Sequence, residues 1–167
     1  MTITMVKTES SNDEAAFKRG IAKANTFLRM FRTLAADMPM QQAEVLLQVA
    51  SYPKGAPMSD LEKRIGISQA SVSRNVAALS KFHRLGKPGL NLVEAVIDPR
   101  EPRKRLVFLT QEGKVFITKL IRTIEADFSI DMTTDAQVEI DRAFEEAQRK
   151  AADEGKTRGK IGKLPPK

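Results

Sequence analysis

A glycine at position 66 separates two short amphipathic stretches, and this break constrains the fold of the 167-residue chain more than any other feature. Leu61 and Ile65 precede the glycine at helical spacing. Glycine is the residue that most readily takes the left-handed conformation that ends a helix. Ser68 follows closely, and serine is a favoured N-cap for a new helix. The sequence therefore predicts two short helices joined by a tight turn.

Local signals also predict where these two helices begin and end. Ser59 and Glu62 have the spacing of a capping box, which predicts that the first helix starts at Asp60. The second helix is expected over residues 68–82, with one apolar and one polar face. Its inward positions are expected to be Val72, Val76 and Leu79. The polar face is then free to meet another molecule.

A β-hairpin with a basic tip is predicted after the helix pair. Two β-type runs, 90–97 and 103–109, enclose a turn rich in proline and charge. Side chains alternate between the two faces of a strand. Arg103 and Arg105 are therefore expected on one face and Lys104 on the other. The order of elements is helix, turn, helix and hairpin.

Longer amphipathic stretches flank this central part. Residues 13–35 carry apolar side chains at steps of three and four, and Thr110 is expected to cap a helix with the same pattern. A last helix is expected to open at Thr134. We expect one domain over 13–153. A flexible N-terminus (1–12) and a disordered basic tail (154–167) are expected to lie outside this domain.

The charge of the chain favours an anionic partner. Lys and Arg number 28 against 21 Asp and Glu, which gives a formal net charge of +7. The excess is concentrated, because residues 68–105 hold eight basic and three acidic residues, and the tail adds a second basic cluster. Localised positive charge is typical of phosphate binding. The open alternative at this point is a basic but otherwise ordinary surface.

Composition excludes several chemistries. The chain has no cysteine, which removes disulfides, thiolate zinc sites and thiol nucleophiles, and its one histidine, His83, has no neighbours at metal-ligand spacing. No acid, base and nucleophile stand in a catalytic pattern, so an enzyme is not expected and no cofactor or metal is predicted. No long apolar run or signal-peptide pattern occurs, which favours a cytoplasmic location.

The sequence resembles the multiple antibiotic resistance regulator (MarR) family from about Pro39 to Phe128. Residues 58–74 resemble its paired helices, and residues 106–113 resemble its strand followed by a Leu-Thr-x-x-Gly helix start. Glu101 and Arg103 stand where that family usually has an Asp-x-Arg pair. Two departures are the glutamate at that position and a longer link over 82–91, which contains Lys87-Pro88-Gly89.

The resemblance implies a mainly α fold with a small β-hairpin wing, a winged helix-turn-helix with flanking dimerisation helices at 13–35 and 110–153. The DNA-binding part would span 39–110, with the recognition helix 68–82 in the major groove and the wing 92–109 on the minor groove. Arginine, glutamine and asparagine are the side chains that grip base edges with two hydrogen bonds. The candidate DNA-binding residues are Ser68, Gln69, Ser71, Ser73, Arg74, Asn75, Lys81, Arg84, Arg100, Arg103 and Arg105. A solvated helix face is the alternative for them.

Two functional hypotheses follow from different classes. The first is a sequence-specific transcription regulator, a repressor by resemblance, that binds double-stranded DNA as a homodimer. Members of that family are often released from DNA by a small-molecule effector, and the sequence does not show whether this chain has one. The second is a DNA-binding assembly or architectural protein, of the packaging, replication-initiation or nucleoid type, that uses the same fold without promoter regulation. The flanking apolar stripes could also pack against the core of their own chain, so the sequence does not decide whether a homodimer forms.

Overall fold

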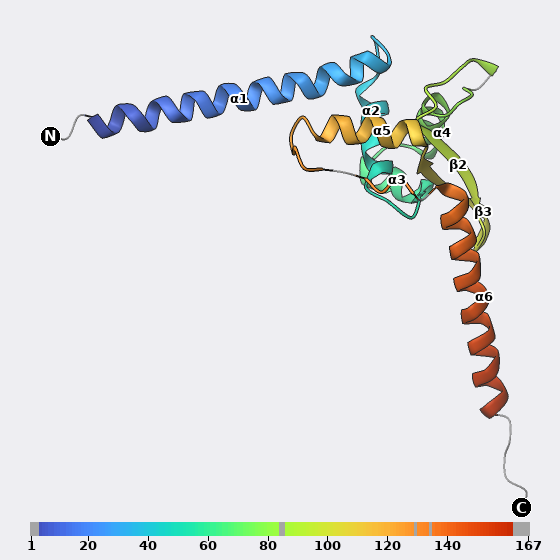
Figure 1. Ribbon diagram of the computed structural model, residues 1–167. Coiled ribbons are helices and arrows are strands. Elements are labelled where there is room, and N and C mark those ends of the chain that lie inside the picture. Colours follow the sequence, from blue (N-terminus) through green and yellow to red (C-terminus); the bar gives the residue numbers. More distant parts are fainter. Residues whose placement is uncertain (1–3, 84–85, 129, 134, 162–167) are drawn as a thin grey trace, which may run out of the picture.

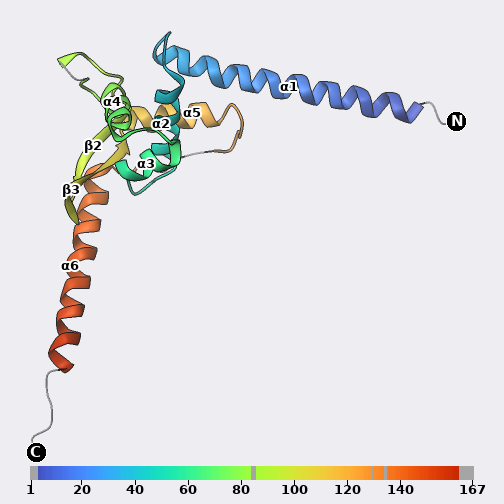
Figure 2. The same cartoon turned by 180° about the vertical axis from the view of Figure 1, so that it is seen from behind.

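The computed structural model describes residues 4–83, 86–128, 130–133 and 135–161. Its elements in order are α1 (Thr4–Leu34), α2 (Met40–Ala50), β1 (Ala56–Pro57), α3 (Met58–Ile65), α4 (Gln69–Leu79), β2 (Val93–Asp98), β3 (Glu101–Leu109), α5 (Gln111–Ile121) and α6 (Ala136–Ile161). Elements α2 to α5 form a body, from which α1 and α6 project in different directions (Figures 1 and 2). The predicted class, mainly α with a small β-hairpin wing, is confirmed.

A single apolar cluster holds the body together. Each of α2, α3, α4, β3 and α5 contributes at least one fully buried side chain to it; these include Leu46, Leu61, Val72, Leu79, Val107 and Leu120. The end of α1 joins this cluster through Phe31, whose ring meets that of Phe116 edge to face at 5.7 Å. Burial of these side chains fixes the position of α4 relative to the wing.

The predicted turn between α3 and α4 is confirmed. Gly66 adopts φ +71° and ψ +32°, and its N–H donates to the Glu62 carbonyl at 2.9 Å. The Ser68 hydroxyl accepts from the Ser71 N–H, as expected of an N-cap. The second helix is shorter than predicted, because α4 ends at Leu79 and not at residue 82. Its last carbonyl groups accept hydrogen bonds from the returning loop and not from further helical turns.

The predicted capping box is wrong, and the reason is a strand that the sequence did not reveal. β1 pairs with β3, with Ala56 opposite Val107, so the chain enters α3 directly from a sheet. Helix α3 therefore begins at Met58 after Pro57, with no side-chain cap. Ser59 is therefore a residue of the first turn of α3 and not its cap, and its hydroxyl donates to the Asp60 carboxylate at 3.5 Å.

The wing is confirmed as an antiparallel hairpin within a three-stranded sheet of order β1-β3-β2. Its register is regular from Val93 opposite Leu109 to Ile97 opposite Arg105. The register then shifts, because Asp98 pairs with Glu101. The three residues 102–104 consequently stand outside the ladder as a bulge.

The two ends of the chain differ from the predicted flexible segments. Helix α1 begins at Thr4, within the predicted flexible 1–12, because residues 4–12 contain no proline or glycine. Helix α6 continues to Ile161, into the predicted disordered 154–167, although Gly155 and Gly159 there are weak helix formers. The remainders of both segments, 1–3 and 162–167, lie outside the described residues.

Helix α6 is attached to the outer face of the wing. Ala136 and Ile140 pack against Leu106 and Phe108 of β3 in a small second apolar cluster. The expected cap, Thr134, lies outside the described residues. The Asp135 carboxylate accepts from the Val138 N–H at 3.0 Å and so caps the helix.

Candidate nucleic-acid interface

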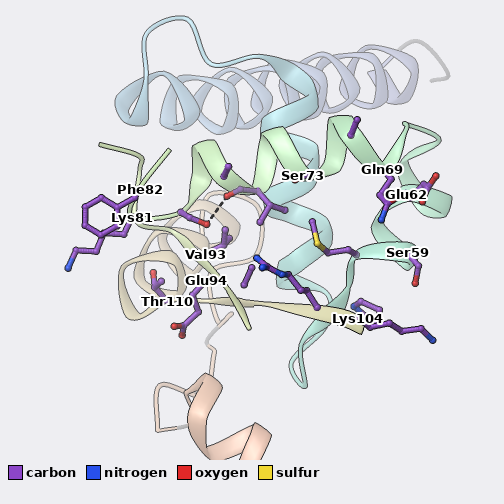
Figure 3. Close-up of a pocket in the computed structure, with 18 of the residues that line it drawn as sticks. Ser59, Glu62, Gln69, Ser73, Lys81, Phe82, Val93, Glu94, Lys104 and Thr110 are labelled. Carbon is purple, nitrogen blue, oxygen red and sulfur yellow. Dashed lines mark hydrogen bonds between the residues drawn. The ribbon is translucent and has the colours of Figure 1, made fainter. Parts of the chain in front are cut away.

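A groove of about 1020 Å³ runs between α4 and the wing (Figure 3). The first turn of α3 forms one end of it, and the start of the α4–β2 connection forms the other. Its walls include Ser59, Gln69, Ala70, Ser73, Ala77, Lys81, Phe82, Asn91, Glu94, Arg103, Lys104 and Arg105. Polar and cationic side chains of α4 and β3 therefore face one shared space.

Helix α4 presents small and polar residues to this groove. Gln69 and Ser73 are exposed and line it, as predicted for recognition-helix positions. Ala70 and Ala77 stand on the same side of the helix, and their short side chains leave the helix axis close to any bound molecule. The helix is therefore shaped for close approach to a flat or concave partner.

Arg74 lies on the solvent-facing side of α4. Its side chain is exposed, and one guanidinium nitrogen donates to the Ser71 hydroxyl at 3.0 Å. A guanidinium has five N–H donors, so this contact leaves others to grip a base edge or a phosphate. Arg74 is exposed, but it is not among the residues that line the groove, and its predicted contact with DNA stays a prediction.

Three other predicted residues make contacts inside the protein. Ser68 caps α4 and meets the Ser71 hydroxyl at 3.1 Å. The Asn75 amide donates to the Gln41 side chain of α2 at 3.0 Å, and Asn75 is partly buried. The Ser68 cap was predicted, whereas the contact by which Asn75 holds α4 against α2 was not indicated by the sequence pattern.

The wing brings three consecutive cations to the groove. Strand alternation predicted Lys104 on the face opposite Arg103 and Arg105, but all three line the groove. The bulge explains the difference, because the register shift after Ile97 removes residues 102–104 from regular alternation. Lys104 also pairs with Glu101 at 2.7 Å, with both side chains more than half exposed. Lys104 was absent from the predicted DNA-binding set.

Arg100 has a different environment from the other wing cations. Its guanidinium donates twice to the Asp98 carboxylate, both at 3.0 Å, and its backbone N–H donates to the same group at 2.9 Å. The Arg100 hydrogen bonds hold the pKa of Asp98 below its ordinary value. Arg100 therefore braces the wing turn as well as carrying positive charge there.

We expect Asp98→Ala to lower the free energy of unfolding by about 1–2 kcal/mol, since it removes three hydrogen bonds from a buried acceptor, while the half-exposed arginine limits the loss. The control is Glu101→Ala, whose exposed ion pair with Lys104 should contribute less than about 0.5 kcal/mol.

The contribution of Asp98 to stability should also depend on pH. Because the pKa of Asp98 is lowered in the folded protein, this stabilisation is complete above about pH 4 and is lost as pH falls through the folded pKa. Urea unfolding at pH 7 and at low pH measures both effects, and equal losses in the two variants would contradict the assignment.

The groove is also lined by two acidic residues, Glu62 and Glu94. Burial raises the pKa of Glu94, and the nearby Asp135 carboxylate raises it further. Glu94 is thus less readily charged than an ordinary surface glutamate, which reduces its repulsion of an anion in the groove.

The second end of the groove holds residues that the prediction only partly covered. Lys81, a predicted residue, lies there beside Phe82, whose ring is 67% exposed. Phe82 was missed because a large apolar residue at the end of a helix is normally predicted to be buried. Arg84, also predicted, lies outside the described residues.

Within the described part of the chain, no group of His, Asp or Glu side chains has the arrangement of a metal site. Over those same residues, no helix has the length and apolar character needed to cross a bilayer.

Residues 36–81, which contain α2, β1, α3 and α4, match the sequence model described as the MarR family. The predicted resemblance to this family is confirmed over that segment. No curated protein matches the chain.

The chain is also similar to several solved structures. The S. aureus MepR–DNA complex is 15% identical, with 93% of this chain and 98% of that chain covered and a TM-score of 0.43. The PcaV transcriptional regulator from Streptomyces coelicolor in complex with its natural ligand is 21% identical, with 82% and 89% covered and a TM-score of 0.40. Reduced AbfR bound to DNA is 13% identical, with 92% and 98% covered and a TM-score of 0.46.

Proposed function

We propose that this chain, whose residues 36–81 match the MarR family, is a sequence-specific DNA-binding transcription regulator that acts as a homodimer. The observation that carries the proposal is the groove in which the exposed face of α4 meets three wing cations. A helix after a tight turn fits the major groove, and a cationic hairpin beside it fits the adjacent backbone or minor groove. Gln69, Ser73 and Arg74 are the proposed base-reading residues of α4.

The wing residues Arg103 and Arg105 are proposed to contact the DNA backbone or minor groove, with Lys104 added to them. Arg100 would contribute charge from its braced position. We propose that Ser68, Ser71 and Asn75 act indirectly. Their observed contacts hold α4 in place, and the groove keeps its shape only when α4 is held there.

Exposed apolar residues on the two projecting helices support the homodimer. Phe17, Ile21 and Leu28 lie along α1 at helical spacing, and each is close to half exposed or more. Phe144 of α6 is 50% exposed. When two chains interleave, the apolar stripes on these projecting helices become buried. Burial of apolar surface of this kind drives association. The DNA-binding part is proposed as 39–110, and the dimer-forming parts as α1 and the segment from α5 to α6.

We further propose that the protein represses its target promoters, that it acts in the cytoplasm, and that it has no catalytic activity. The groove walls support a binding role, since their polar groups are distributed along a helix and a hairpin and do not converge on one reacting atom. A small-molecule effector is compatible with this function, and its chemistry is left open.

Arg74→Ala tests this function at its base-reading helix. We expect affinity for the preferred duplex to fall about 5- to 150-fold and preference at the contacted base pair to relax, because a guanidinium contact to a base is worth about 1–3 kcal/mol. Arg29→Ala, which removes an exposed arginine from α1, is the matched control and should leave preference unchanged. Fluorescence anisotropy on the preferred duplex and a shuffled duplex measures both.

The affinity of the unmodified protein for the same two duplexes completes this test. A regulator should prefer its site over shuffled DNA by about 1000-fold or more, whereas an assembly or architectural protein should discriminate far less. Equal losses on both duplexes in Arg74→Ala would remove α4 from sequence reading.

A further inference from the structure

The connection between α4 and β2, residues 80–92, is anchored along the end of α4. The backbone N–H groups of Leu90, Asn91 and Leu92 donate to the carbonyls of Ala78, Ser80 and Leu79, at 3.1, 3.2 and 2.8 Å respectively. These bonds cap the last turn of the helix with the returning chain. The α4–β2 loop therefore continues α4 as a fixed extension.

A second set of contacts shapes the loop beyond this base. Gly89 donates to the Lys81 carbonyl at 3.0 Å, and a Cβ at position 89 would clash with the Ser80 carbonyl oxygen, so only glycine allows this approach. The His83 N–H donates to the Lys87 carbonyl at 2.8 Å, and Phe82 forms a bridge with Pro88. The two arms of the loop are held side by side as in a short hairpin.

The loop displays an aromatic ring beside a lysine. The Phe82 ring is 67% exposed, and the Lys81 ammonium lies 5.7 Å from its centroid. Lys87 is exposed on the opposite arm. The anchored backbone holds this apolar ring in water, where packing against a partner would remove apolar surface from solvent.

Charge indicates what covers it. No Asp or Glu occurs between Glu62 and Glu94, while this stretch holds several lysines and arginines. Lys81 and Phe82 line the same groove as α4 and the wing, at the end away from Gln69 and Lys104 (Figure 3). The surface is therefore continuous with the proposed DNA interface and shares its sign of charge.

We propose that the α4–β2 loop is an additional contact to duplex DNA, in which Lys81 and Lys87 meet phosphates and the Phe82 ring packs on the sugar of the same strand. The inference rests on the proposed function and extends it from two contact elements, α4 and the wing, to three. Phosphate contacts position a protein on DNA without reading sequence. The loop therefore adds affinity and register, while α4 keeps the sequence preference.

The double variant Lys81→Ala/Lys87→Ala tests the phosphate contacts. Each phosphate contact contributes about −0.9 to the slope of log K against log salt, so we expect the slope to become about 1.8 less steep and affinity to fall about 60-fold at 0.1 M salt. The control is Lys54→Ala/Lys119→Ala, which removes two exposed lysines that do not line the groove and should leave the slope unchanged. Circular dichroism confirms that each variant folds.

Phe82→Ala tests the ring separately. We expect affinity to fall several-fold with an unchanged salt slope, since the ring carries no charge, and hydroxyl-radical footprinting should lose protected sugars at one edge of the site. An unchanged slope in the double lysine variant together with an unchanged footprint in Phe82→Ala would overturn the proposal, including the case in which a protein partner covers the loop. Failure of the proposed function would appear differently, as a lack of sequence preference in the unmodified protein.

Discussion

Replacing Phe17 and Ile21 together with glutamate should convert the proposed homodimer to a monomer. Both side chains are exposed on α1, by 69% and 49%, and stand on one face of the helix. Two buried carboxylates in an apolar contact would each cost several kcal/mol, which exceeds what an interface of ordinary size can tolerate. Light scattering should then report a mass near 18.5 kDa in place of twice that value.

The same variant should bind a two-half-site duplex at least about 100-fold more weakly, because the second half-site no longer binds at the high effective concentration that a dimer provides. The matched control is Ala22→Glu/Thr26→Glu, which adds the same charge on the opposite face of α1 and should remain dimeric. A Phe17→Glu/Ile21→Glu protein that stays dimeric would show that α1 packs elsewhere.

Gly113→Ala should lower the free energy of unfolding by about 3 kcal/mol, although alanine is normally the better helix former. Gly113 is buried in the first turn of α5, and a Cβ there would clash with the Leu92 carbonyl oxygen. That oxygen accepts from the Thr110 N–H at 3.1 Å, and the Thr110 hydroxyl donates to the Asn91 carbonyl at 2.6 Å. The substitution must therefore separate α5 from the chain that enters β2.

Gly20→Ala is the control for this effect. An added Cβ at this helical position has nothing within 4 Å, so the change should stabilise the protein by up to about 1 kcal/mol through helix propensity alone. Thermal or urea unfolding of both variants gives the comparison. If Gly113→Ala were as stable as the unmodified protein, the close approach of α5 to Leu92 would be wrong.

Local signals allowed much of the body to be predicted from sequence. Gly66, Ser68 and Thr110 act through backbone conformation and hydrogen bonds to their own neighbours, so each end of a helix that they define was correct. The hairpin was also correct, because its β-type runs enclose a turn with strong local chemistry.

Features set by distant contacts were missed. Strand β1 has two residues, too few for any periodic pattern, and its pairing with β3 displaced the expected cap at Ser59. Asn75 was expected to face DNA, but its contact with Gln41 joins residues 34 positions apart. The wing bulge changes the face on which Lys104 lies, and alternation cannot predict a register shift.

The sequence predicted the location of the candidate site more reliably than it predicted which residues form the site. Clustering of charge and the order of elements placed it between α4 and the wing, where the groove lies. Phe82 was missed because its exposure depends on how the loop after α4 is anchored, through hydrogen bonds between main-chain groups that carry no side-chain signature. Arg100 was included for its charge, while its contact with Asp98 shows a bracing role.

Selection of bound duplexes from a random DNA library, with purified protein at near-physiological salt, tests the central claim most directly. A dimeric regulator that reads DNA through α4 should recover a palindrome whose half-sites lie about one helical turn apart. Recovery that depends on salt but yields no motif would contradict the claim, because a protein that contacts only phosphates cannot distinguish one sequence from another.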